Sequence, residues 1–339
     1  MLRFAQFYAI QAHFLQTQLC YYVPMKTLRQ YIQQARETGT AIGHFNISNV
    51  EALNGIVKAA QKLNVPVIIG VSEGERDFIG VHQVSALVRS LRQKLNHPIF
   101  LNADHTYSFE RVKEAIDAGF DMVITDHAGT DMQENIKFTR QAVQYAKEVS
   151  ERRAKGQSAA GDAVSRAELD FPTEVLVEAE IGYIGKSSKV LDGVPAEIPL
   201  DENGNIALSA LTTAEDASTF VRETGIDLLA PAVGNLHGIV KNAQPKLNIA
   251  RISEIVASTD APLVLHGASG IGNDELAAAV GAGISMVHYN TELRIAYRDA
   301  LKKSLDENPN EVAPYKFLAS SVEAVEKVVE EKLRVMNKM

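Results

Sequence analysis

The chain has few of the features that would direct it to an oxidising compartment, to nucleic acid or to a membrane. Its 339 residues include one cysteine, Cys20, so no disulfide can form within the chain and a thiolate metal site is excluded. Acidic residues outnumber basic ones by 42 to 34, and the net charge of -8 provides no basic field for a nucleic-acid backbone. We therefore expect a cytoplasmic protein that binds neither nucleic acid nor membranes. Small anionic substrates are still compatible with this charge, because helix N-termini and a few local cations suffice to hold them.

The first 24 residues differ in composition from the rest of the chain and are rich in Phe, Tyr, Leu and Gln. Glutamines and His13 interrupt this apolar stretch, which makes it a poor signal peptide and too short to span a bilayer. An amphipathic helix is predicted to begin near Met25. We hypothesise that Met25 is the biological start and that residues 1–24 are an upstream extension. The alternative is a genuine N-terminal helix that packs on the domain or on a partner.

Short runs of Val, Ile and Leu alternate with stretches of helical periodicity from residue 25 onwards, a pattern typical of a parallel sheet. The expected strands are 41–46, 66–72, 98–103, 121–125, 174–180, 227–233, 262–266 and 284–290. The expected helices are 50–63, 82–95, 109–118, 134–149, 214–224, 249–258, 274–282 and 292–305. Eight such units predict an α/β fold in which residues 25–339 form a single (β/α)8 TIM barrel. A doubly wound sheet would show the same alternation, but no glycine-rich dinucleotide fingerprint follows the first strand.

Two segments interrupt the regular spacing, and a helical tail follows the last unit. Residues 151–172 are polar and rich in small side chains, which predicts a mobile excursion. Residues 186–209 contain the turn signal Asp201-Glu202-Asn203-Gly204-Asn205 and are expected to form a short hairpin or a lid over the barrel mouth. The amphipathic tail after Pro314 is expected to pack on the barrel or on a second subunit.

Polar residues collect where the predicted strands end, and this is where a barrel of this type builds its active site. Three histidines, His105, His237 and His266, lie at or just beyond three of these ends. Three neutral imidazoles bind zinc well and leave a fourth position open for substrate or water. The ligands are far apart in the sequence, so this inference depends on barrel closure. The histidines outside this set are expected to be ordinary surface or core residues: His13, His44, His82 and His97.

Two glycine-rich turns, at residues 234–238 and 266–270, favour a phosphate site beside the metal. Such turns let backbone amides approach an anion closely, and the second leads into a helix whose N-terminus favours negative charge. Lys241 would add a cation. Glycines needed only for tight turns are the alternative explanation for either loop alone.

At these residues the sequence resembles the class II fructose-bisphosphate and tagatose-bisphosphate aldolase family, from about Met25 to the C-terminus. The resemblance rests on several motifs in the same order as in that family. They are Phe45-Asn46-Ile47-Ser48-Asn49-Val50-Glu51, Ser72-Glu73-Gly74, Asp104-His105, Val177-Glu178-Ala179-Glu180-Ile181-Gly182, Val264-Leu265-His266-Gly267-Ala268-Ser269-Gly270 and Asn290-Thr291-Glu292-Leu293-Arg294.

The resemblance implies one catalytic Zn2+ bound by His105, His237 and His266, with Glu180 as an alternative ligand or a neighbour of the metal. A second divalent or a monovalent cation is compatible with it. The metal would act as a Lewis acid on a ketose carbonyl, Asp104 would pass a proton to or from the substrate hydroxyl, and no Schiff-base lysine is needed. The implied substrate and phosphate contacts are Asn46, Ser72, Gly238, Lys241, Gly267, Ser269, Asn290 and Thr291.

Four positions depart from the family pattern. His288 stands where relatives commonly have an Asn that contacts the reacting substrate, and His127-Ala128 replace a Gly-Ser pair. The loop at 185–193 lacks the usual Gly-Gly-x-Glu-Asp-type pattern, and its acidic residue is Asp192. The excursion at 151–172 is longer than relatives need. His288 and Asp192 therefore join Asp104 as candidate catalytic residues.

The leading hypothesis is an aldehyde-lyase that joins dihydroxyacetone phosphate to an aldehyde such as glyceraldehyde 3-phosphate, with fructose 1,6-bisphosphate as the default ketose. Two alternatives stay open. One is an aldolase for another phosphorylated ketose, such as tagatose bisphosphate or a deoxy-keto-sugar acid phosphate. The other is a non-catalytic, zinc-dependent phosphosugar-binding protein. The resemblance also implies a homodimer or homotetramer.

Overall fold

A computed structural model describes residues 25–157, 172–186, 189–241 and 244–339 of the chain. The predicted N-terminal extension, residues 1–24, lies outside the described residues. The same holds for residues 158–171, which make up most of the predicted excursion at 151–172. The first residues of that excursion are not a loop, because helix α7 continues through Ala154.

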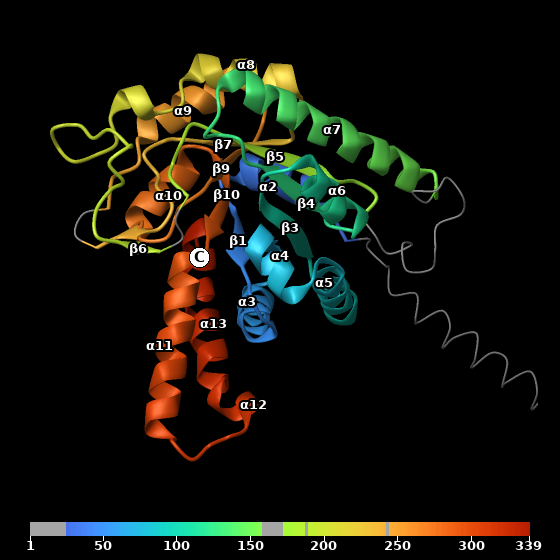
Figure 1. Cartoon of the computed structure of the whole chain (residues 1–339), viewed down its shortest axis with the longest axis vertical. Coiled ribbons are helices and arrows are strands. Elements are labelled where there is room, and N and C mark those ends of the chain that lie inside the picture. Colours follow the sequence, from blue (N-terminus) through green and yellow to red (C-terminus); the bar gives the residue numbers. More distant parts are fainter. Residues whose placement is uncertain (1–24, 158–171, 187–188, 242–243) are drawn as a thin grey trace, which may run out of the picture.

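Eight parallel strands close into a barrel, in the order β1-β2-β3-β4-β5-β7-β9-β10 and back to β1 (Figure 1). This confirms the predicted (β/α)8 fold. Each strand begins within two residues of its predicted start. The strands are β1 (Ile42–Asn46), β2 (Val67–Val71), β3 (Ile99–Thr106), β4 (Met122–Thr125), β5 (Leu176–Ile181), β7 (Leu228–Pro231), β9 (Leu263–Leu265) and β10 (Ile284–Tyr289).

Helices cover the outside of the barrel, and three of them have the predicted bounds: α3 (Val50–Leu63), α8 (Ala214–Thr224) and α9 (Ile249–Ser258). The others are α5 (Val81–Leu95), α6 (Phe109–Asp117), α7 (Met132–Ala154) and α10 (Asn273–Gly281). Helix α4 (Glu73–Ile79) was not predicted. Its sequence signal is a capping box, in which Ser72 and Glu75 satisfy the first free amides of the helix.

The amino-terminal end of the barrel is closed by α2 (Leu28–Thr38), the helix expected to begin near Met25. Leu28, Ile32 and Ala35 on its buried face pack against the inward-facing residues of the strands. These partners include Ile68 of β2 and Phe100 of β3. Apolar side chains therefore fill the barrel interior at this end, and the active sites of such barrels lie at the opposite end, where the strands finish.

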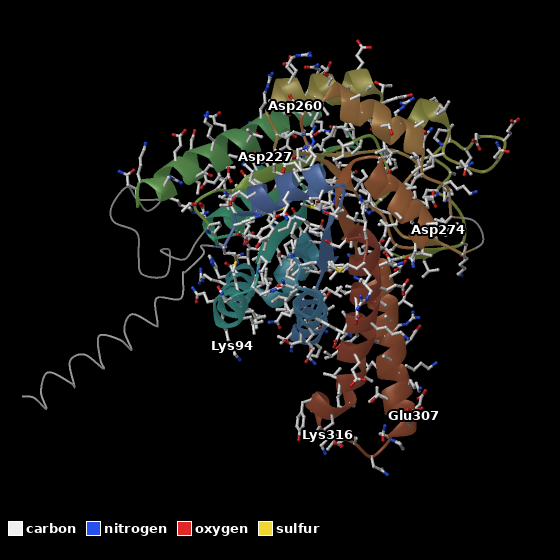
Figure 2. The ribbon with its side chains drawn as sticks, turned by 180° about the vertical axis from the view of Figure 1, so that it is seen from behind. Lys94, Asp227, Asp260, Asp274, Glu307 and Lys316 are labelled. Atoms are coloured by element: carbon white, nitrogen blue, oxygen red, sulfur yellow. The ribbon has the colours of Figure 1, made fainter. Side chains whose placement is uncertain are left out.

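The C-terminal helices form an arm that extends from the barrel (Figure 1). It consists of α11 (Thr291–Glu307), α12 (Pro314–Phe317) and α13 (Ala319–Met336). Figure 2 shows Glu307 and Lys316 at its far end. Helix α13 packs against α3 and α11 and buries Val325, Val329 and Leu333, so the barrel itself covers part of the predicted apolar stripe. Among the described residues, none of the helices combines the length and apolarity needed to cross a membrane.

The segment at 186–209, predicted to form a short hairpin or a lid, contains both a parallel strand pair and a small antiparallel turn. Strand β6 (Val190–Leu191) pairs in parallel with β8 (Ile239–Val240), outside the barrel. An antiparallel bridge between Leu200 and Ile206 then closes the predicted turn at residues 201–205, and a short 3-10 helix spans Leu208–Ala210. The segment buries Ile198 and Ile206 in a small apolar cluster of its own beside the mouth of the barrel.

Candidate active site and metal centre

The predicted polar residues converge at the carboxyl end of the barrel. Strand β3 carries Asp104 and His105, β5 carries Glu180, and His266 follows β9 directly. His237 lies in the turn between β7 and β8. The donor atoms of these three histidines and of Glu180 all lie within 4.8 Å of one another. These residues are far apart in the sequence, and barrel closure brings them together.

An irregularity in β3 directs His105 towards this group. The register between β3 and β4 shifts between Ala103 and Thr106, which indicates a bulge. His105 has a φ of 36°, a conformation that non-glycine residues rarely adopt. Backbone strain of this kind persists where the surrounding structure imposes it and is often found at functional sites.

Carboxylates fix the orientation of two of the histidine rings. The Nδ1 of His105 lies 2.8 Å from Asp126 Oδ2, and the Nε2 of His266 lies 2.6 Å from Glu178 Oε1. His105 thus has one nitrogen engaged by a carboxylate and the other directed to the donor group, whereas the second nitrogen of His266 contacts Glu180, which is itself a member of that group. This arrangement is typical of histidine ligands in metal sites, where the carboxylate fixes the ring and raises its basicity.

The donor group fits a divalent metal such as zinc. His237 Nε2 is buried without a hydrogen-bond partner among the described residues, which is costly unless a ligand or an ion satisfies it. Three imidazoles and a carboxylate are a donor set that zinc accepts in tetrahedral geometry. Glu180 Oε2 lies 3.0 Å from His266 Nδ1 and 3.6 Å from His237 Nε2, so this carboxylate can serve as a ligand or neutralise the group.

The carboxylates of this centre shift the pKa values of its histidines. Burial alone would lower the pKa of His105, but Asp104 and the hydrogen bond to Asp126 raise it to about 9. Burial would likewise lower the pKa of His266, whereas Glu178 and Glu180 raise it well above its ordinary value. These rings therefore carry protons when no metal is present.

Asp104 is held ionised beside this centre. Burial would raise its pKa, but His105 and the neighbouring histidines hold the pKa well below its usual range. Asn46 Nδ2 donates to Asp104 Oδ2 at 2.7 Å and to Glu75 Oε2 at 2.8 Å. The other carboxylate oxygen, Asp104 Oδ1, is buried and has no hydrogen-bond partner among the described residues. It is therefore free to accept a proton from a bound substrate.

A small cavity next to the metal centre is lined by the predicted anion-binding residues Gly238, Gly267, Ser269, Asn290 and Thr291, together with Asn46, Asp104 and His288. Gly267 has a φ of +60°, and a Cβ there would lie 2.3 Å from the Leu236 carbonyl oxygen. Only glycine allows this approach of the two loops. The first residue of α11, Thr291, also lines the cavity, so the N-terminus of this helix can attract an anion.

The remaining predicted site residues lie elsewhere. Lys241 and Asp192 form an ion pair of 2.6 Å at the surface, and the Asp192 side chain is 93% exposed. Neither residue lines the cavity or the mouth above it. Ser72 lies at the mouth, where its amide and hydroxyl both donate to Glu75. His127, which stands where relatives have the Gly of a Gly-Ser pair, stacks on Phe138 and lies outside the donor group.

The sequence interpretation overlooked several residues of this site. His44 was expected to be an ordinary core or surface residue, but it is buried and stacks on His288. Glu178 was part of a recognised motif but received no role. Glu75 could have been singled out by its capping-box spacing from Ser72. A wider mouth above the cavity, with a volume of about 670 Å3, adds Tyr107, Tyr183, Lys186, Lys189 and Arg294.

The fold and the site together define a barrel enzyme with a histidine-rich metal centre and a buried ionised carboxylate beside it. Comparison with known families then gives its relatives. The family model described as "Fructose-bisphosphate aldolase class-II" matches residues 26–151 and 164–339. The chain belongs to this metal-dependent family, and it is an aldolase of this class, a lyase.

Individual relatives agree with this assignment. A fructose-bisphosphate aldolase of Staphylococcus epidermidis is 34% identical over 92% of this chain and 97% of its own length. A fructose-bisphosphate aldolase of Geobacillus stearothermophilus is 33% identical over 91% of this chain and 95% of its own. The crystal structure of the YdjI aldolase of Escherichia coli K12 matches with a TM-score of 0.70 and 28% identity, covering 91% of this chain and 96% of that one.

Proposed function

We propose that this chain uses Zn2+ to cleave and form a phosphorylated ketose, with fructose 1,6-bisphosphate as the default substrate and dihydroxyacetone phosphate and glyceraldehyde 3-phosphate as products. The observation that carries the proposal is the group of four metal donors, His105, Glu180, His237 and His266, beside the free oxygen of Asp104. A zinc ion held there would supply Lewis-acid polarisation of the ketose carbonyl.

The protein residues provide the proton transfer. During cleavage, the hydroxyl next to the breaking carbon–carbon bond loses its proton and becomes the carbonyl of the departing aldehyde. The electron pair of the broken bond stays on the dihydroxyacetone phosphate half, which is later protonated. Asp104 Oδ1 is suited to accept the hydroxyl proton, because it is ionised and its second oxygen is fixed by Asn46.

The cavity supports binding of the ketose phosphate group that lies next to the carbonyl. We assign this phosphate to Gly238, Gly267, Ser269, Asn290 and Thr291, around the N-terminus of α11. Lys241 and Asp192 enter the proposal only if the loops that carry them move, because their surface ion pair keeps them away from the cavity in this structure.

One observation favours a ketose other than fructose 1,6-bisphosphate. His288 occupies the inner wall of the cavity where relatives commonly have Asn, and the mouth above it combines Lys186, Lys189 and Arg294 with polar and aromatic groups. These cations would suit an acidic group at the far end of the ketose. Tagatose bisphosphate and a deoxy-keto-sugar acid phosphate are therefore the alternative substrates. We also propose a cytoplasmic homodimer or homotetramer.

The test is the rate of fructose 1,6-bisphosphate cleavage by the purified protein, before chelation, after chelation and after zinc is restored. Activity that chelation removes and zinc restores supports the proposal. A panel of the alternative ketose phosphates, measured under the same conditions, separates the substrates. Binding of zinc and dihydroxyacetone phosphate without cleavage of any member of the panel would instead support the non-catalytic binding protein.

A further inference from the structure

Three imidazole rings form a continuous stack across the inner wall of the site. The register of β1 and β10 places His44 directly opposite His288. Their rings are 3.6 Å apart between centroids and inclined by only 8°. On its other side, His288 lies 4.3 Å from the ring of His266 at an angle of 25°. His288 is therefore held between the expected metal ligand His266 and the buried His44.

Within the described part of the chain, His288 has no strong hydrogen bond to fix this position. Its nitrogens lie 3.7 Å from Asp104 Oδ1 and 3.7 Å from Glu178 Oε2, which is too far for a hydrogen bond. Its Nε2 lies 3.4 Å from the sulfur of Met286, which is a weak acceptor. The orientation of the ring is consequently determined by the two rings that it stacks on.

His44 is itself closely fitted. Asn102 Nδ2 lies 3.0 Å from His44 Nε2. On β2, a Cβ at Gly70 would lie 2.1 Å from His44 Cε1, so a glycine is needed to make room for the ring. The ring of His44 is fully buried, and Asn102 is fully buried as well. Strands β2 and β3 thus form a close-fitting space for this side chain.

The same imidazoles cannot share a second metal ion, although the donor atoms of His44, Asp104 and His288 lie within 4.8 Å of one another. An imidazole nitrogen binds a metal through a lone pair in the plane of its ring. Two rings stacked nearly parallel have planes that do not meet at a common ion. The arrangement therefore fixes ring orientation and does not form a coordination site.

We propose that His44 is a positioning residue, which holds the His288 ring in the plane where its Nδ1 and Asp104 Oδ1 contact the same substrate oxygen. The two atoms are 3.7 Å apart, and both residues line the cavity. One oxygen atom can lie at an ordinary hydrogen-bond distance of about 2.8 Å from each of them. This inference rests on the proposed function, because it concerns the oxygen atoms of that substrate.

The first experiment observes His288 without catalysis. Imidazole nitrogens are followed by NMR in the zinc-loaded protein labelled with 15N-histidine, and His288 is assigned from the spectrum of His288→Ala. We expect a single sharp tautomer for His288 in the unaltered protein. In His44→Ala, its ring signals should broaden or average between tautomers, because the ring can then reorient. His288 signals that stay unchanged in His44→Ala would overturn the proposal.

The second experiment is a double-mutant cycle on ketose cleavage with His44→Ala, His288→Ala and the double variant. We expect His44→Ala to lower kcat about 10- to 100-fold, since small misplacement of a reacting group has effects of this size. KM should change less, because the phosphate contacts remain. In the His288→Ala background the same substitution should change kcat by less than about twofold. An equal loss in both backgrounds would show a role that does not pass through His288.

Two further variants separate positioning from folding. His44→Gln keeps a planar group that can bond to Asn102, so it should restore part of the rate and also serves if His44→Ala does not fold. His97→Gln is the matched control: His97 is likewise buried, its Nε2 donates to the Val65 carbonyl at 2.9 Å, and it lies ahead of β3 at the opposite end of the barrel. It should leave kcat and the His288 signals unchanged. If no ketose phosphate is cleaved, the proposed substrate is wrong, while the NMR experiment still decides the role of His44.

Discussion

Replacing Glu178 by glutamine should weaken metal binding although Glu178 is not an expected ligand. Its carboxylate is fully buried, and Oε1 accepts a 2.6 Å hydrogen bond from Nε2 of His266. That bond leaves Nδ1 of His266 as the nitrogen available to the metal. Glutamine has almost the same shape as glutamate but lacks the negative charge that raises the basicity of the imidazole.

The size of the effect follows from the position of the bond. Carboxylates that orient a metal-binding histidine typically contribute 10- to 100-fold to metal affinity, or about 1.4–2.7 kcal/mol. Glu178 lies at the upper end of this range, because its environment excludes the water that would screen its charge. We therefore expect the zinc dissociation constant of Glu178→Gln to rise about 100-fold.

The assay is competition for zinc between the metal-free protein and a chromophoric chelator. Glu174→Gln is the matched control: Glu174 lies just ahead of the same strand, is 38% exposed and pairs with Arg29 at 2.6 Å. The control should bind zinc as the unaltered protein does. Burial raises the pKa of Glu178 and so opposes the charged form on which this prediction depends. If Glu178→Gln kept full affinity, the carboxyl group would be acting in its protonated form and the reasoning above would be refuted.

Further predictions concern the reaction, the packing and the surface. Asp104→Asn should lower kcat by about 10²- to 10⁴-fold with zinc content unchanged, as measured by steady-state kinetics and metal analysis. Gly70→Ala should destabilise the fold by about 1–3 kcal/mol in urea unfolding, because the new methyl group would overlap His44. Asp192→Asn should leave the rate within about twofold if its surface pair with Lys241 is its only role. A loss of about 100-fold or more would make it a catalytic residue of a closed loop.

Much of the barrel could be predicted because most of the strands are short apolar runs rich in Val, Ile and Leu, each followed by a periodic helix. The metal donors could be predicted for a related reason. His105, His237 and His266 lie where such runs stop, and a closed barrel must bring these ends together. The bulge that turns His105 inward could not be predicted, because it depends on the pairing between β3 and β4.

His44 shows why other parts of the site could not be predicted from the sequence. It lies inside β1, where alternation alone assigns it to the core, and only the register opposite His288 reveals its contact with the site. The place of Lys241 in this structure could not be predicted for a similar reason. A lysine after a glycine-rich turn favours phosphate binding, but the pairing of β6 with β8 directs it to Asp192 at the surface.

Protons and metal compete for the same ring nitrogens, and the pKa shifts give the sign of the resulting pH dependence. In the metal-free protein, the pKa of His105 is about 9 and that of His266 is raised well above its ordinary value, so both rings are protonated at pH 7.5. Zinc binding must release these protons, about two per ion at that pH. As the pH rises through 9, His105 loses its proton in the metal-free protein even before zinc binds, and the number released should fall by about one. Zinc affinity should accordingly increase from pH 7 to 9. Calorimetric titrations in buffers of different ionisation enthalpy measure the protons released, and a value near zero at pH 7.5 would mean that Asp104 and Glu178 do not hold these rings in the charged form.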